Sequence, residues 1–136
     1  MFAKKRAEDI KWIPKLWGGE KIICNNEFYC GKLLIFMKGR RASLHYHCNK
    51  REHFFLKTGK LEVWFSDELN RVEKFMNAHG TDGLYDILEK EILEQGDVFY
   101  VPPKRLHMIH ALSDSELFEF STHDELSDSY RLLKSE

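Results

Sequence analysis

The chain has 136 residues and a mass of 16.2 kDa, which suits one domain built around one hydrophobic core. Hydrophobic residues make up 43% and charged residues 32%, the balance of an ordinary globular domain rather than of a disordered or membrane-embedded chain. Lysine and arginine number 21 and acidic residues 22, so the net charge of −1 lacks the basic excess typical of nucleic-acid binding. We therefore expect a small-molecule partner, and neither nucleic acid nor a membrane.

The cysteines indicate a reducing compartment. Cys24, Cys30 and Cys48 cannot all pair within the chain, and no two of them form a C-x-x-C motif. The first ten residues are basic but lack the apolar stretch that a secretion signal requires. We expect a cytoplasmic protein with free thiols.

Short strands dominate the first half of the chain, and 13% aromatic residues favour an all-β domain. The apolar run at 31–38 predicts a strand buried on both faces, and 44–48 predicts the next strand. Segments 52–57 and 60–65 predict a hairpin, with Gly59 supplying the positive φ of its turn.

Residues 66–90 differ in character from the rest. Charges of both signs are followed by His-Gly and Asp-Gly pairs, and then by a short helix-like segment at 84–90. We expect an exposed excursion, which can be a long hairpin tip, a helix or a lid. Strands then resume at 98–101, 106–112 and 118–121.

Two histidines have the spacing of metal ligands. His45 and His47 are two residues apart, so on a strand their imidazoles share one face. Glu52 follows at an odd interval, but a turn at 49–51 would return its carboxylate to the same side. His107, behind a turn fixed by two prolines, can add a third imidazole from a neighbouring strand. Such a set suits one divalent ion among Mn, Fe, Ni, Co, Cu and Zn and does not select one of them.

These residues carry a family resemblance. The fixed positions of the first cupin motif are matched by Gly39, His45, His47, Glu52 and Gly59. The second cupin motif is similar to the pattern formed by Gly96, Pro102 and His107. It departs at two positions, because Lys104 stands where the motif has glycine and Ala111 where it has asparagine.

The resemblance implies a fold and a domain organisation. It implies a double-stranded β-helix, which is a jelly-roll barrel with the metal inside and His45, His47, Glu52 and His107 as ligands. We expect residues 1–136 to form a single cupin domain, with its barrel over about 17–123 and the excursion at 66–90. Since such barrels commonly pair through sheet edges, a homodimer is expected.

Further stretches resemble single-cupin proteins called mannose-6-phosphate isomerase-like. They are residues 17–19, 30–33, 118–122 and 128–131. This resemblance implies a sugar or sugar-phosphate substrate and an isomerisation between aldose and ketose. In that reaction the metal would bind substrate oxygens while a base moves a proton.

Three further residues are candidates for the base and for substrate binding. Glu119, inside an apolar run, is either an outward residue of an edge strand or an inward acid near the metal, and it is our candidate catalytic residue. Lys104 and Arg131 are candidates for holding a phosphate or carboxylate at the barrel mouth, against the alternative of solvated surface residues. No ligand role is assigned to Cys48 or to the remaining histidines, His53, His79, His110 and His123.

Three functions remain open from the sequence. The first is a metal-dependent sugar or sugar-phosphate isomerase. The second is an Fe(II)-dependent oxygenase that uses the same ligands, and the third is a non-catalytic module that binds a sugar or a metal. Metal-free sugar epimerases of the same superfamily rank last, because the ligand set is complete.

Overall fold

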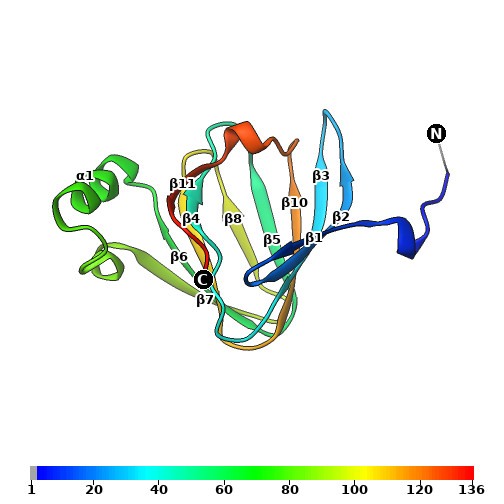
Figure 1. Cartoon of the computed structure of the whole chain (residues 1–136), viewed down its shortest axis with the longest axis horizontal. Coiled ribbons are helices and arrows are strands. Elements are labelled where there is room, and N and C mark those ends of the chain that lie inside the picture. The colour runs from blue at the N-terminus through cyan, green and yellow to red at the C-terminus, as the bar shows by residue number, and fades with distance from the viewer. Residues whose placement is uncertain (1–2) are drawn as a thin grey trace.

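Two antiparallel β-sheets face each other in a jelly-roll barrel (Figure 1). The computed structural model describes residues 3–136, so residues 1–2 of the predicted domain lie outside it. The larger sheet has six strands in the order β1-β2-β3-β10-β5-β8, and the smaller has five in the order β11-β4-β9-β6-β7. The prediction of an all-β barrel is confirmed, and β1 and β11 extend the sheets beyond 17–123.

The strands of the six-stranded sheet are β1 (Lys11–Lys15), β2 (Gly18–Asn25), β3 (Cys30–Phe36), β5 (Glu52–Thr58), β8 (Val98–Val101) and β10 (Ser115–Ser121). Those of the five-stranded sheet are β4 (Leu44–Tyr46), β6 (Lys60–Ser66), β7 (Glu89–Glu94), β9 (Leu106–Ala111) and β11 (Tyr130–Leu133). The helical elements are α1 (Leu69–His79) and the 3-10 turns η1 (Ala7–Asp9), η2 (Leu84–Ile87) and η3 (Leu126–Asp128).

Side chains alternate between the barrel interior and the outside, as period-two strands require. On β5, Glu52, Phe54 and Leu56 are buried while the residues between them are exposed. On β3, the inward residues are buried, but Leu33 and Ile35 between them are only half-buried. The prediction that β3 is buried on both faces is therefore wrong, because nothing in the described chain covers the outer face of its sheet.

The predicted hairpin at 52–65 is also wrong, although both strands exist. Strand β5 pairs with β8 and β10, whereas β6 pairs with β7 and β9, so consecutive strands enter different sheets. Gly59 forms the corner with a φ of 97°. A Cβ at this position would lie 2.1 Å from the hydroxyl oxygen of Ser115, so the crossing requires glycine.

The excursion packs against the barrel rather than lying fully exposed. Strands β6 and β7 form a long antiparallel hairpin whose far end carries α1 and η2 (Figure 1). Val72, Leu84 and Leu88 are buried there against Leu106 and Met108 of β9. The α-helix lies at 69–79, while the segment at 84–90 forms only a 3-10 turn and the start of β7.

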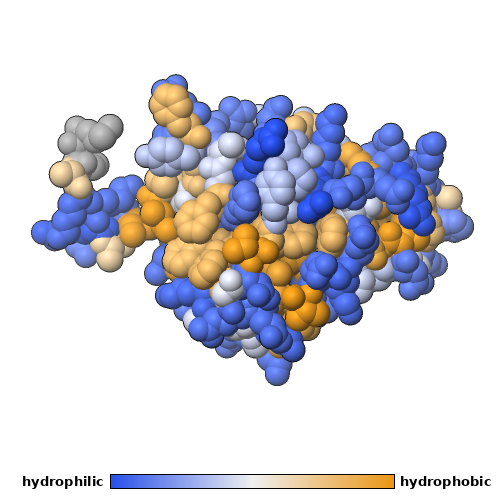
Figure 2. Space-filling model, turned by 180° about the vertical axis from the view of Figure 1, so that it is seen from behind, coloured by the Kyte–Doolittle hydropathy of each residue, from blue (hydrophilic) through white to orange (hydrophobic). Residues whose placement is uncertain are grey.

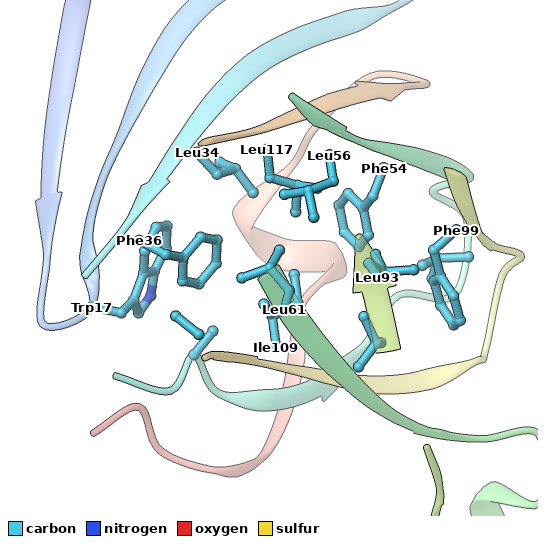
Figure 3. Close-up of a cluster of buried hydrophobic side chains, with 14 residues drawn as sticks. Trp17, Leu34, Phe36, Phe54, Leu56, Leu61, Leu93, Phe99, Ile109 and Leu117 are labelled. Carbon is cyan, nitrogen blue, oxygen red and sulfur yellow. The ribbon is translucent and has the colours of Figure 1, made fainter. Parts of the chain in front are cut away.

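Apolar side chains fill one part of the barrel interior (Figure 3). Leu56, Leu61 and Leu117 are fully buried in this cluster, and the rings of Trp17 and Phe36 stack with centroids 4.3 Å apart. This packing holds the two sheets together. It leaves the other end of the same interior to polar residues.

The outer face of the six-stranded sheet exposes apolar side chains, among them Phe55, Val98 and Phe120. Figure 2 shows hydrophobic side chains gathered on one side of the molecule. The three cysteines are free thiols. In residues 3–136, no helix has the length and apolar character needed to cross a membrane.

Candidate metal centre

Three histidines converge inside the barrel next to the apolar cluster, where the rings of His107 and Phe54 lie with centroids 6.0 Å apart. His45 lies on β4 and His107 on β9, and the two residues are direct partners in the pairing of these strands. His47 follows β4 on the same face as His45. One ring nitrogen of each histidine lies within 4.8 Å of those of the other two. The structure thus brings together the three imidazoles that the sequence predicted as ligands.

The backbone fixes the orientation of all three rings. Each ring contacts a backbone carbonyl oxygen through its Nδ1. The three pairs are His45 with Ser43 at 3.1 Å, His47 with Asp128 at 2.8 Å and His107 with Arg105 at 3.0 Å. Because a carbonyl only accepts a hydrogen bond, each Nδ1 carries the proton and each Nε2 keeps its lone pair. This arrangement is the usual support of metal-binding histidines.

Burial keeps two of these rings neutral. Burial lowers the pKa of His45 well below its ordinary value, and the neighbouring His107 and His47 add to this effect. Burial also lowers the pKa of His47, against the opposing influence of Glu52. Neutral imidazole is the form that binds metal.

Glu52 supplies an oxygen beside the histidines. Its Oε2 lies 3.4 Å from Nε2 of His107 and is buried without a hydrogen-bond partner. Its Oε1 lies 3.7 Å from Nε2 of His47 and 2.9 Å from Nζ of Lys50. Although burial favours the neutral acid, neighbouring groups that include the ammonium of Lys50 hold the pKa of Glu52 well below its usual range, so Glu52 is a carboxylate. A carboxylate oxygen and a nitrogen lone pair facing each other are both acceptors, so a cation between them fits this site.

Lys50 connects the centre to two more acids. Its ammonium, in a residue only 3% exposed, contacts Glu52 at 2.9 Å, Glu119 at 2.8 Å and Asp124 at 2.8 Å. Burial opposes the charge, but these carboxylates outweigh it and raise the pKa of Lys50. Lys50 was not predicted from the sequence, because its position in the turn at 49–51 follows no strand periodicity.

Lys32 is a second buried lysine in the same network. It lies on β3, is 7% exposed, and contacts Asp124 at 2.8 Å and Glu20 at 3.1 Å. Despite burial, Glu119 and Glu20 raise its pKa. The signal that could have revealed it is its place in the alternation with Leu34 and Phe36, on the inward face of the strand.

Glu119 faces the interior, which decides between the two orientations left open by the sequence. It is 4% exposed on β10 and is held by Lys50 and by the hydroxyl of Ser121, 3.0 Å away. Burial and the charge of Glu52 raise the pKa of Glu119 to about 7, against the pull of Lys50 and Lys32. A carboxyl group with such a pKa can both give and take a proton near neutral pH.

Asp128 shapes the turn between His47 and Glu52, and sequence reasoning missed it. Its carboxylate accepts the backbone N–H groups of Cys48 at 2.8 Å, Asn49 at 3.1 Å and Lys50 at 3.1 Å. Its backbone carbonyl accepts the Nδ1–H of His47. One buried residue therefore positions both a histidine and the turn that leads to Glu52.

The two predicted substrate-binding residues are separated. Arg131, on β11 opposite His45, is exposed and borders the cavity in front of the histidines. Lys104 is exposed on another side, where it borders a surface hollow with Tyr46 and residues of α1. Lys104 is therefore not placed to bind a ligand in the metal cavity. Its φ of 70° shows that the turn keeps the left-handed backbone that favours the glycine of the cupin motif, a conformation that lysine adopts at a cost.

The residues without a predicted ligand role lie outside the centre. Ala111, which replaces the asparagine of the second motif, is buried and accepts the N–H of Gly39 through its backbone at 2.8 Å. Cys48 borders the hollow near Lys104. The four other histidines contact groups elsewhere: His53 stacks on Tyr100, His79 packs on Phe75, His110 contacts Glu62 and His123 contacts Asn26.

A cavity of about 170 Å³ lies in front of the metal centre. Histidines, lysines and acids line its polar side, while Trp17, Leu34 and Phe36 line the other. The segment that follows β10 borders it through Asp124, Leu126 and neighbouring residues. The fold and the site thus define a jelly-roll barrel with a histidine-rich, charged cavity suited to a metal and a small polar ligand.

The chain belongs to the cupin family, whose sequence model matches residues 34–131. KdgF from Halomonas sp. has a similar structure, with a TM-score of 0.65 and 19% identity over 88% of this chain and 94% of that one. No curated protein matches the chain.

Two larger proteins contain a similar barrel. CapF, solved with the inhibitor 3-isopropenyl-tropolone, gives a TM-score of 0.71 and 16% identity over 92% of this chain and 34% of CapF. Oxalate decarboxylase from Bacillus subtilis gives a TM-score of 0.69 and 18% identity over 92% of this chain and 30% of the enzyme. The chain spans about a third of each of these two proteins, and at such identities the likeness establishes the fold alone.

Proposed function

We propose that this cupin is a metal-dependent isomerase that interconverts the aldose and ketose forms of a sugar or sugar phosphate. One divalent transition-metal ion would be held by His45, His47 and His107, with Glu52 as a fourth ligand. The observation that carries the proposal is the convergence of three Nε2 lone pairs beside the unpartnered Oε2 of Glu52. The ligand set suits Mn, Fe, Ni, Co or Zn.

The residues around the centre support proton transfer. A bound divalent ion would polarise the carbonyl and hydroxyl oxygens of the substrate. Glu119, whose pKa is raised to about 7, would take the proton from C2 and return it to C1. A second proton moves between the two substrate oxygens, so the reaction adds and removes no atoms. Lys50 holds the Glu119 carboxylate at 2.8 Å and so positions the proposed base.

Metal content tests the site. The wild-type protein, purified without a histidine tag, is expected to carry about one ion per chain, and His47→Ala is expected to lose it. His53→Ala is the matched control, because His53 is an exposed histidine on the outer face of β5. Retention of the ion by His47→Ala, or its absence from the wild type after supplementation with Mn, Fe, Ni, Co and Zn, would refute the metal centre.

Turnover tests the reaction. With a panel of aldoses and their phosphates in deuterated water, an isomerase incorporates solvent deuterium into its product under anaerobic conditions. Glu119→Gln is expected to lower the turnover number about 100-fold or more, with metal content unchanged. Oxygen consumption with Fe(II) would replace the isomerase by an oxygenase. Saturable ligand binding without turnover would replace it by a binding module.

We also propose a homodimer in a reducing, cytoplasmic setting. Support for a dimer is the exposed apolar surface on the outer face of the six-stranded sheet, and support for a reducing setting is the three free thiols. Sedimentation analysis of wild type and Phe120→Glu tests the dimer. A wild-type protein that sediments as a monomer at micromolar concentration would contradict it.

A further inference from the structure

Two buried ammonium groups hold one carboxylate at the edge of the metal cavity. Nζ of Lys50 lies 2.8 Å from Oδ1 of Asp124, and Nζ of Lys32 lies 2.8 Å from Oδ2 of the same residue. The two oxygens of a single carboxylate thus each bind one ammonium. We propose that Lys32 and Lys50 form the binding site for a carboxylate group of the substrate, and that Asp124 occupies this site until the substrate displaces it.

This inference rests on the proposed function, because it assigns the substrate class of the same cavity. It narrows the substrate to a molecule that carries an anionic oxygen group besides the groups that would face the metal. The predicted anion-binding role of Lys104, which lies elsewhere, then falls to Lys32 and Lys50, which border the cavity itself.

The lysines are preorganised independently of Asp124. Without it, Lys50 still contacts Glu52 at 2.9 Å and Glu119 at 2.8 Å, and Lys32 still contacts Glu20 at 3.1 Å. Both ammonium groups therefore stay charged and fixed when the aspartate side chain moves away. Such prearranged donors are what a buried anion site requires, because little conformational freedom is lost on binding.

Among the acids that contact Lys32 and Lys50, Asp124 is the one best suited to exchange. Its side chain is 21% exposed, compared with 13% for Glu20, 5% for Glu119 and 2% for Glu52. It belongs to the segment after β10, whereas the other three acids lie on strands. Asn25 fixes its backbone through hydrogen bonds of 3.0 and 3.1 Å, so side-chain rotation alone can vacate the site.

Charge balance selects the ligand. Exchange of the Asp124 carboxylate for another carboxylate leaves the charge around the two lysines unchanged, whereas a neutral ligand would leave them with one acid fewer. A phosphate group has the same oxygen chemistry but a larger charge and a tetrahedral shape. The flat, two-oxygen arrangement of Asp124 favours a carboxylate, and the experiment compares both.

The test measures the binding of acetate and of inorganic phosphate to metal-free protein by thermal shift, at constant ionic strength set with chloride. In the Asp124→Ala variant the internal competitor is gone, so we expect the dissociation constant for acetate to fall about tenfold or more relative to wild type. Glu125→Ala is the matched control, since it removes the neighbouring cavity acid without touching either lysine, and it should behave as wild type. Adding Lys32→Met to Asp124→Ala should abolish the gain.

The outcomes separate cleanly. Equal acetate affinity in Asp124→Ala and wild type, or a gain that survives Lys32→Met, would overturn the proposal, and a gain for phosphate alone would overturn the choice of carboxylate. If Asp124→Ala fails to fold, Asp124→Ser gives the same comparison, because serine also lacks the carboxylate that bridges the two ammonium groups. Because metal-free protein is used, failure of the metal centre or of isomerase turnover leaves this result readable.

Discussion

The two ends of the barrel interior are built by the same strands and differ in chemistry. On β3, β5 and β10 the inward residues Lys32, Glu52 and Glu119 belong to the charged part of the interior, while Leu34, Leu56 and Leu117 on the same strands belong to the apolar cluster. Strand pairing places Glu119 opposite Lys32, and Leu117 opposite both leucines. Along each strand, the charged residue and the apolar residue are only two to four positions apart.

This difference separates stability from function. The apolar end lowers the free energy of the folded state by removing side chains from water. The polar end holds buried charges, which cost free energy to desolvate unless each finds partners, and the close contacts of Lys32 and Lys50 provide those partners. A protein that needed only stability would fill this end with apolar residues as well.

Removal of the Lys50 ammonium should have the largest effect on stability. Lys50→Met leaves Glu52, Glu119 and Asp124 without their shared ammonium, so we expect a loss of about 3–5 kcal/mol in the free energy of unfolding at pH 7. Urea denaturation measures it. Lys57→Met, which removes an exposed lysine from the other end of β5, is the control and should change stability by less than about 0.5 kcal/mol. Equal effects would show that the network does not stabilise the fold.

A cavity made at the apolar end should lower stability without changing metal binding. Leu56→Ala removes a fully buried side chain and should cost about 3 kcal/mol. The same variant should keep the metal content of the wild type per folded chain, because Leu56 does not line the cavity in front of the histidines, although Phe54 of the same cluster packs against His107. Elemental analysis after removal of unfolded protein checks this expectation. Loss of the ion would mean that the two ends are coupled.

Loosening the turn at the polar end should weaken metal binding without removing a ligand. Asp128→Asn disturbs the hydrogen bonds to the backbone at 48–50, and we expect metal affinity to fall about 10- to 100-fold. Competition with a chromophoric chelator measures the affinity. Glu125→Gln, an exposed acid in the same segment, serves as control. Unchanged affinity in Asp128→Asn would show that Asp128 does not position the centre.

The smallest expected effect is on the pH dependence of stability. Asp124 and Glu119 should change the free energy of unfolding in opposite directions as the pH rises. Lys50 and Lys32 outweigh burial and lower the pKa of Asp124 from 3.8 to about 2, so its contribution is present above pH 3.8 and is lost as the pH falls through 2. Burial raises the pKa of Glu119 from 4.5 to about 7, so its contribution is present below pH 4.5 and is lost as the pH rises through 7.

Two variants isolate these contributions in metal-free protein. Asp124→Asn should flatten the decline of stability below pH 4, and Glu119→Gln should flatten the decline between about pH 4.5 and 7. Denaturation midpoints measured across this range test both. A Glu119→Gln curve parallel to that of wild type would contradict the raised pKa of Glu119.

The sequence predicts the histidines because strand alternation alone places His45 and His47 together. The sequence also places the Glu52 carboxylate on the side of the histidines, once a turn is assumed at 49–51. Sequence patterns do not report which strands pair, so the crossing at Gly59 was predicted as a hairpin. A glycine between two strands serves either connection, and only the partners of β5 and β6 decide between them.

The charged network was beyond prediction for a different reason. Asp124 and Asp128 are far in sequence from Lys50, and they reach it because the segment after β10 returns across the barrel mouth. No periodicity encodes that return. Lys32 did leave a trace, a lysine at an inward position, but the expectation of a strand buried on both faces hid it.

The pairing of β3 with β10 has a kinetic consequence. Ser115 pairs with Phe36 and Ser121 with Cys30, so this part of the sheet joins residues from opposite halves of the sequence. Closing such a long loop costs chain entropy before any contact compensates for it, and folds with this topology are slow to form. We expect His45 and His47 to come close to His107 only when the two sheets have packed together. Metal capture would then follow the rate-limiting step of folding rather than guide it.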